Sequence, residues 1–289
     1  MAEEAKRKKV GLALSGGFIR ATAQIGVIEV LEENGIPIDL ISGCSSGAAI
    51  GAAYAAGTLP MMKKRLSEGS RRDYWQVIFQ PTIPRHGLLK GERSRKFFEE
   101  FVGDKHFIQL NKQVLMTATD LRSMEEVIIE EGLVSTGIQA CTAVPGIFVP
   151  VTINNQILVD GANLNMIPSK VLYARGADYV IAVDVSRQPN LITRSIANFR
   201  RLFRRQAAAE KFTKSHETLN TFQLMARTFR LSTTQIKNLY HNAYPYDALI
   251  TPDVSRVRRT SVSLVDFCIR EGRLAALEAL PKIKRDLGL

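Results

Sequence analysis

Cysteine, tryptophan and histidine are scarce in this chain of 289 residues, which has three Cys, one Trp and four His. The cysteines, Cys44, Cys141 and Cys268, are odd in number and widely spaced, which excludes a disulfide framework and favours reduced thiols in a cytoplasmic protein. No apolar run is long enough to span a bilayer. Met1 to Lys9 is charged and lacks an apolar core, so we expect no secretory signal.

Motifs for metals are also missing. Neither H-E-x-x-H nor C-x-x-C occurs, so metal catalysis is disfavoured and we expect no metal and no cofactor. Of the four histidines, only His216 and His241 lie late enough for a Ser–Asp–His order. Neither follows a strand-to-loop signal, so a histidine-based triad is disfavoured as well.

The most informative motif that is present is Gly43-Cys44-Ser45-Ser46-Gly47. It follows the apolar segment Ile36 to Ile41, which predicts a strand, and precedes the small-residue segment Ala48 to Gly57, which predicts a helix. G-x-S-x-G in this context is typical of a nucleophile elbow, a tight turn that holds the serine Oγ above a sheet. Ser45 is therefore the candidate nucleophile, and a plain glycine-rich turn is the alternative.

A second glycine-rich loop lies near the N-terminus. Lys9 to Leu14 predicts a buried strand, and Ser15 to Arg20 predicts a loop. The apolar spacing after this loop predicts a helix that ends at Gly35. Such a loop gathers backbone N–H groups, which suits an anion or the oxyanion of acyl transfer, and Arg20 adds positive charge. Neither G-x-x-x-x-G-K-[ST] nor G-x-G-x-x-G is present here, so a nucleotide site is disfavoured, and a plain turn remains open.

The segment Ile157 to Ala162 supplies a carboxylate. An apolar strand ends in Asp160, which Gly161 follows, and a strand would deliver this carboxylate to a site at the carboxyl edge of the sheet. Asp-Gly after a strand is most often only a turn. In the presence of the other two motifs, Asp160 is a candidate to accept the proton of the Ser45 hydroxyl.

Together these motifs resemble those of the bacterial patatin-like phospholipases. The likeness runs from about Lys9 to the C-terminus, through Gly11–Gly17, Gly43–Gly47, Ala118–Leu121, Ala143–Phe148 with Pro150, Val159–Ala162 and Gly176–Val185, the last matching the final core strand. The resemblance implies a three-layer α/β fold with a mainly parallel central sheet flanked by helices. It also implies a lipid acyl hydrolase that uses a Ser45–Asp160 dyad. An oxyanion hole at Gly16 and Gly17 is implied too.

One residue departs from the pattern of this family. Its loop usually has glycine or a small residue where this chain has Phe18. A phenylalanine is unfavourable there if the position needs a positive φ. Either Phe18 and Ile19 line an acyl groove beside Arg20 while their N–H groups point inward, or the oxyanion hole is distorted and the protein is slow or silent.

Positive charge is the other strong feature, with a formal net charge of +11. Basic residues are densest between residues 194 and 214, where apolar residues recur at helical spacing. This pattern favours a basic amphipathic helix on an anionic membrane surface, and an ordinary surface helix is the alternative. No nucleic-acid motif accompanies the charge, so a nucleic-acid partner is disfavoured.

We therefore expect a flexible basic N-terminus over residues 1–8 and one domain over residues 9–289, with a basic helical subregion at 190–243. The expected activity is hydrolysis of fatty-acyl esters of phospholipids or related lipids through an acyl-enzyme on Ser45. The expected location is the cytoplasm, with peripheral contact to the inner face of the membrane. A lipid-binding protein without efficient catalysis and an acyltransferase are the alternatives. The sequence does not specify an oligomer.

Overall fold

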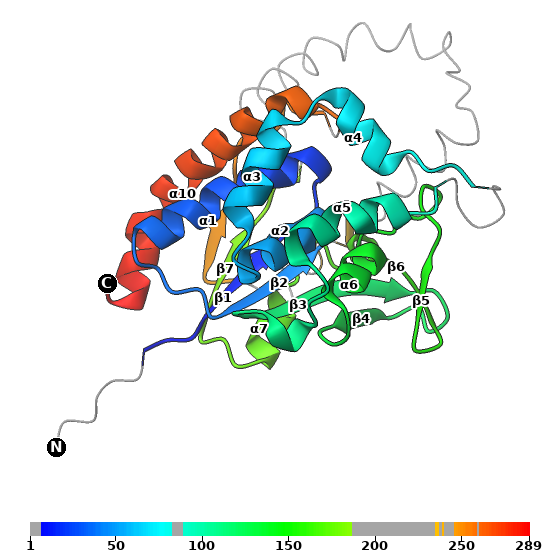
Figure 1. Ribbon diagram of the computed structural model, residues 1–289. Coiled ribbons are helices and arrows are strands. Elements are labelled where there is room, and N and C mark those ends of the chain that lie inside the picture. Colours follow the sequence, from blue (N-terminus) through cyan, green and yellow to red (C-terminus); the bar gives the residue numbers. More distant parts are fainter. Residues whose placement is uncertain (1–6, 83–88, 187–234, 237–238, 240–245, 259) are drawn as a thin grey trace, which may run out of the picture.

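The computed structural model describes residues 7–82, 89–186, 235–236, 239, 246–258 and 260–289. One mixed sheet runs through the middle of this part of the chain, in the order β5-β6-β3-β2-β1-β7-β8, with β4 paired to β3 (Figure 1). The strands are β1 (Val10–Leu14), β2 (Leu40–Cys44), β3 (Gln113–Asp120), β4 (Glu126–Ile129), β5 (Val151–Ile153), β6 (Gln156–Asp160), β7 (Tyr179–Val183) and β8 (Ala248–Ile250).

The sheet is parallel at one end and antiparallel at the other. Strands β3, β2, β1, β7 and β8 are parallel neighbours, whereas β4 and β6 run antiparallel to β3, and β5 antiparallel to β6. The expected mainly parallel α/β sheet is thus confirmed. The segment Gly176–Val185 contains β7, but β7 is not the last strand, because β8 pairs beyond it.

Strand β2 begins later than the sequence predicts. The apolar run from Ile36 suggests a strand, yet residues 36–39 have no strand pairing and β2 starts at Leu40. Pro37 explains the difference, because proline lacks the N–H that a ladder needs. The elbow itself is unaffected, since β2 ends at Cys44.

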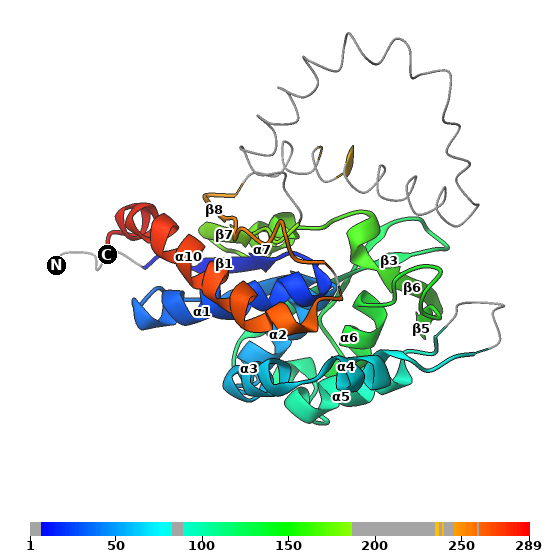
Figure 2. The ribbon, with the colours of Figure 1, turned by 90° about the horizontal axis from the view of Figure 1, so that it is seen from above.

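Helices cover both faces of the sheet, which gives three layers (Figure 2). Alternation along each strand sends Leu12 and Leu14 to one face and Ala13 to the other. The larger face is covered by α1 (Ala23–Glu33), α2 (Ser46–Ala55), α6 (Val134–Cys141) and α10 (Val265–Leu287). The opposite face is covered by α7 (Ser169–Ala174).

Helix α10 is continuous, although the sequence suggests breaks at Gly272 and Pro281. Pro281 is exposed, so water can satisfy the carbonyl group that its missing N–H leaves without a partner. Gly272 is buried against α1, where an added Cβ would lie 1.8 Å from the carbonyl oxygen of Ala23. The glycine therefore sets how closely α10 approaches α1.

Three further helices lie beyond α1 and α2, on the side away from the sheet (Figure 2), and we call them the cap: α3 (Leu59–Glu68), α4 (Arg71–Ile78) and α5 (Glu92–Val102). Four short 3-10 helices complete the described chain, at Phe18–Thr22, Phe107–Gln109, Gly161–Asn163 and Val262–Leu264. Across the described ranges, none of the helices combines the length and the apolar character needed to cross a membrane. The expected basic segment 194–214, most of the subregion 190–243 and residues 1–6 lie outside the described residues.

Candidate active site

Ser45 lies in a tight turn between β2 and α2, as the elbow motif predicts. Its φ of 53° and ψ of −130° are outside the helical and strand regions. The helix that follows approaches the sheet closely, because a Cβ added to Gly47 would lie only 2.5 Å from the carbonyl oxygen of Leu14. Ser45 is 8% exposed, so its side chain sits at the base of a recess rather than on the surface.

The pairing of β3 explains how Asp160 comes close to Ser45. Cys44 pairs with Thr117, and Asp160 pairs with Ala118, the next residue of β3. Strand β4 occupies the other edge of β3 at these positions, so β2 and β6 share one edge and their carboxyl ends meet. Asp160 therefore reaches the site on an antiparallel strand that returns toward the elbow, rather than on a parallel strand as expected.

The carboxylate of Asp160 is buried, with 3% of the residue exposed. Its Oδ1 accepts a hydrogen bond of 2.9 Å from the backbone N–H of Ala162, and the Cys44 Sγ lies 3.8 Å from the same oxygen. The Ala162 contact fixes the carboxylate at the end of β6. The structure thus brings a buried, oriented carboxylate next to the residue that precedes the candidate nucleophile.

Two buried thiols, those of Cys44 and Cys141, lie near the carboxylate of Asp160. Burial raises the pKa of Cys44 and of Cys141 well above the ordinary value for cysteine, and the charge of Asp160 raises both further. Both thiols therefore stay protonated and unreactive near neutral pH. Cys44 is completely buried, as structural cysteines usually are.

The glycine loop lies directly beside Ser45. A Cβ added to Gly16 would be 3.0 Å from the Ser45 Cβ, so only glycine leaves that space open. The N–H of Gly17 donates a 3.0 Å hydrogen bond to the Ser46 Oγ. Phe18 has a φ of 53°, the positive value that the sequence analysis identified as unfavourable for phenylalanine.

Arg20, unlike Phe18, does not line the pocket described below. It lies in the 3-10 helix Phe18–Thr22 and is buried. Its charge acts on the thiol of Cys268 in α10, whose pKa burial nevertheless raises to about 11. The structure therefore places Arg20 toward α10 rather than in the lining of the pocket.

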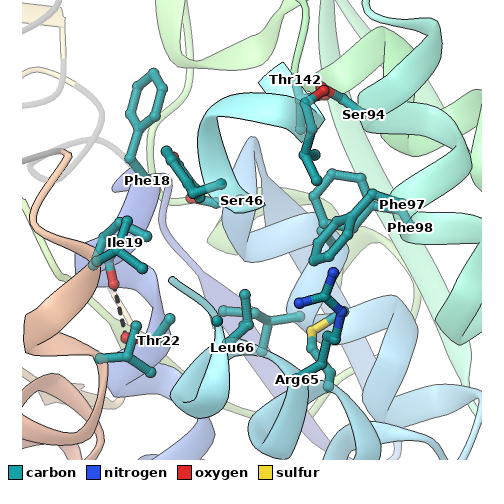
Figure 3. Close-up of a pocket in the computed structure, with 18 of the residues that line it drawn as sticks. Phe18, Ile19, Thr22, Ser46, Arg65, Leu66, Ser94, Phe97, Phe98 and Thr142 are labelled. Carbon is teal, nitrogen blue, oxygen red and sulfur yellow. Dashed lines mark hydrogen bonds between the residues drawn. The ribbon is translucent and has the colours of Figure 1, made fainter. Parts of the chain in front are cut away.

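A pocket of about 140 Å³ opens above Ser45. Figure 3 shows Phe18, Ile19 and Thr22 on one side and Arg65, Phe97 and Phe98 on the other. The lining is mostly apolar, and it consists of Phe18, Ile19, Thr22, Ser45, Ser46, Ala49, Ile50, Met62, Arg65, Leu66, Gly69, Ser70, Asp73, Tyr74, Val77, Ser94, Phe97, Phe98, Thr142, Val144, Phe148, Val262 and Val265. An apolar recess beside a serine suits a hydrocarbon chain.

The pocket residues that come from α5 were not predicted from the sequence. Helix α5 contributes Ser94, Phe97 and Phe98, whose spacing of three and four residues places them on one helical face. That spacing is a detectable signal, but it does not say what the face covers. Helix α4 also lines the pocket, with Tyr74 and Val77.

No group of three or more His, Cys, Asp or Glu side chains in the described part of the chain is arranged to hold a metal ion. The polar groups that the described residues place at the site include the Ser45 hydroxyl, the buried carboxylate of Asp160 and the backbone N–H groups of the glycine loop.

Comparison with known proteins gives one family. The profile described as patatin-like phospholipase matches residues 12–173. An uncharacterised NTE family protein of Mycobacterium tuberculosis is 30% identical over 287 residues, which cover 94% of this chain and 46% of that protein. Lysophospholipase NTE1 of Debaryomyces hansenii is 30% identical over 186 residues, covering 62% of this chain and 12% of that one. This chain thus spans about half the length of the mycobacterial relative and a small part of the fungal one.

Among solved structures, VipD from Legionella pneumophila superposes with a TM-score of 0.49 at 12% identity, covering 95% of this chain and 67% of that one.

Proposed function

Because this chain belongs to the patatin-like phospholipase family, we propose that it is a serine hydrolase that cleaves fatty-acyl esters of phospholipids or related lipids. One observation carries the proposal: β2 and β6 end against each other on β3, next to an apolar pocket that Ser45 lines. Nucleophile, carboxylate and a space for a hydrocarbon chain thereby occur at one point. The fungal relative named as a lysophospholipase supports the same substrate class.

In the proposed reaction, the Ser45 Oγ attacks the carbonyl carbon of the ester while Asp160 accepts the hydroxyl proton. The tetrahedral intermediate then collapses, the bond to the leaving alcohol breaks, and that alcohol takes the proton from Asp160. In the second half, water attacks the carbonyl carbon of the acyl-serine while Asp160 accepts a proton from the water. The bond between the acyl carbon and the Ser45 Oγ then breaks, the Oγ takes the proton back from Asp160, and the fatty acid leaves. No histidine or metal is required for either half.

Stabilisation of the oxyanion is assigned to the loop of Gly16 and Gly17. The Gly17 N–H already has an oxygen partner in the Ser46 Oγ, at 3.0 Å. We propose that the carbonyl oxygen of the substrate replaces the Ser46 hydroxyl as acceptor when charge develops on it. Removing one such donor typically lowers the rate by about 10²–10³-fold.

The pocket determines where the acyl chain lies. Phe97 and Phe98 from α5 and Ile19 from the glycine loop enclose apolar space above Ser45. A fatty-acyl chain would displace water from these surfaces at a gain of about 0.8 kcal/mol per buried CH₂. Polar lining residues such as Arg65 and Ser70 come from the cap, Arg65 from α3 and Ser70 from the start of α4.

Labelling with a fluorophosphonate probe tests the proposal directly. Wild-type protein should be labelled, Ser45→Ala should not, and Asp160→Asn should be labelled at a rate lower by about 10²-fold or more, because the hydroxyl loses its proton acceptor. Ser123→Ala, at an exposed serine outside the pocket lining, is the serine control and should retain labelling.

No labelling of the wild type, with or without lipid vesicles, would contradict the hydrolase assignment. A lipid-binding protein of the same fold would then be the better interpretation. If labelling succeeds, adding an alcohol as acceptor distinguishes a hydrolase from an acyltransferase. An acyltransferase would form a new ester with the added alcohol in place of free fatty acid.

A further inference from the structure

Helix α4 has two distinct faces. Its inner face contributes Ser70, Asp73, Tyr74 and Val77 to the pocket, at positions three, four and seven residues apart. Burial raises the pKa of Tyr74 to about 12, consistent with a phenol held inside the protein. The inner face is therefore accounted for by the site already described.

The outer face is exposed and contains large aromatic residues. Trp75 is 43% exposed and Phe79, directly after the helix, is 55% exposed. Arg71 precedes Trp75 by four residues, so these three positions form one stripe along the helix. Figure 1 shows α4 at the periphery of the molecule, above α5. About half of the surface of each aromatic residue is therefore open to solvent in the described structure.

Positive charge surrounds the aromatic stripe. Arg71 and Arg72 are exposed on the first turn of α4, and Arg93 is tied to its end because the guanidinium donates a 3.0 Å hydrogen bond to the carbonyl oxygen of Phe79. Lys90 is also exposed. Its backbone N–H donates a hydrogen bond to the carbonyl oxygen of Gln80, the residue after Phe79. Glu68 and Glu92 are the exposed acidic neighbours in the adjoining sequence.

We propose that this surface, defined as Arg71, Arg72, Trp75, Phe79 and Arg93, docks the protein on an anionic phospholipid bilayer. The proposal rests on the proposed function, because a bilayer is the source of that substrate. Tryptophan is well suited to the boundary between headgroups and acyl chains, and arginine to anionic headgroups. The combination of exposed aromatic side chains with flanking cations is the chemistry of an interfacial helix.

Docking through α4 would also place the pocket near the lipid. The same helix lines the pocket on one face and would touch the bilayer with the other, so an acyl chain would travel little more than the helix diameter of about 10 Å. A cap helix at the interface therefore links membrane contact to access to Ser45. The segment 194–214, for which the sequence predicts membrane contact, lies outside the described residues.

The chain contains an intrinsic reporter for this proposal, because Trp75 is its only tryptophan. The full-length Ser45→Ala variant, which leaves vesicles intact, is mixed with vesicles of phosphatidylcholine and phosphatidylglycerol. Trp75 emission should shift to shorter wavelength and be quenched by lipids that have a nitroxide near the headgroup. Vesicles of phosphatidylcholine alone should give a much smaller change, and added salt should reverse the binding.

Charge reversal supplies the second measurement. Arg72→Glu should weaken vesicle binding by about tenfold, because one favourable contact becomes a repulsion. A carboxylate at the helix N-terminus should not harm the fold. Arg285→Glu, an exposed reversal on α10, is the matched control and should bind like the parent.

The outcomes separate this surface from the proposed function. Vesicle binding with no change in Trp75 emission would overturn the surface on α4 and favour another part of the chain. Absence of any vesicle binding would overturn it as well. Fluorophosphonate labelling without lipid is scored independently, so labelled protein with silent Trp75 leaves the hydrolase assignment standing. Insertion of Trp75 into vesicles without fluorophosphonate labelling would support the docking surface on α4 and contradict the hydrolase assignment.

Discussion

Phe18 has a backbone conformation that L-residues seldom adopt, and it does so next to the candidate nucleophile. Its φ of 53° costs about 1–2 kcal/mol relative to a right-handed conformation. The side chain nevertheless lines the pocket. The ring therefore forms part of the groove at a position whose backbone conformation favours glycine, and whether this conformation distorts the oxyanion hole stays a prediction.

Two substitutions separate the ring from the strain at this position. Phe18→Gly and Phe18→Ala both remove the ring, but only glycine tolerates the positive φ. We expect Phe18→Gly to be more stable than Phe18→Ala by about 1 kcal/mol. Urea unfolding of both variants measures the difference. Equal stability would show that the loop relaxes to another conformation.

Asp120 closes the turn that follows β3. Its carboxylate accepts hydrogen bonds from the backbone N–H groups of Arg122, at 3.1 Å, and Ile157, at 3.0 Å, so it ties the turn to β6. These contacts lower its pKa, the bond from Arg122 most strongly. The sequence presents Asp120 only as part of a matching segment, and the structure supplies its role.

The lowered pKa of Asp120 gives a pH dependence with a definite sign. The ionised carboxylate stabilises the fold fully above the unfolded pKa of about 3.9, and that contribution is lost as the pH falls toward the lower folded pKa. Asp120→Asn should therefore be less stable than the wild type at pH 7, and the gap should narrow below about pH 4. Urea unfolding at pH 7, 5 and 3 measures this gap. Asp104→Asn, at an exposed position, is the control for a lost carboxylate; a gap independent of pH would contradict the role of the charge.

At the scale of the element, α1 and α10 make the closest helix contact described above. A Cβ on Gly272 would lie 1.8 Å from the carbonyl oxygen of Ala23, and one on Gly26 would lie 2.0 Å from that of Ile269. Each helix thus presents a glycine to the backbone of the other. Ion pairs from Arg273 to Glu29 and Glu33 join the same two helices at the surface.

Alanine at Gly272 should therefore destabilise the protein. In an ordinary helix the change from glycine to alanine stabilises by about 1 kcal/mol, but here the methyl group meets backbone that must move, and overpacking typically costs about 1–3 kcal/mol. Thermal or urea unfolding of Gly272→Ala gives the sign. Glu278→Ala, on the exposed side of α10, should change the free energy of unfolding little. A stabilised Gly272→Ala would show that the two helices are not in this close contact.

Element types were predictable from the sequence where local pattern and tertiary structure agree. The strands β1, β3 and β4 and the helices α1 and α2 follow from apolar runs and glycine ends. Pro37 and Pro281 show the limit in opposite directions. The first removes a predicted strand end, while the second leaves α10 intact because its position faces water.

At the scale of the whole molecule, the resemblance gave the family and the fold class, and the structure supplied how distant parts meet. Ser45 and Asp160 were identifiable because each ends a strand in a recognisable motif. Their approach was not, since it depends on the antiparallel return of β6 along the edge of β3. The pocket wall from Phe97 and Phe98 depends in the same way on a helix that packs from elsewhere in the chain.

Because β2 and β6 share one edge of β3, the candidate site lies between the parallel half and the antiparallel half of the sheet. The parallel half ends in Ser45, and the antiparallel half ends in Asp160, while β3 belongs to both. Because side chains alternate along a strand, a slip of β6 by one residue would turn the Asp160 carboxylate to the opposite face without unfolding either half. The pairing register on β3 thus sets where Asp160 lies relative to Ser45, so the proposed hydrolysis would be lost to a misalignment that leaves secondary structure unchanged.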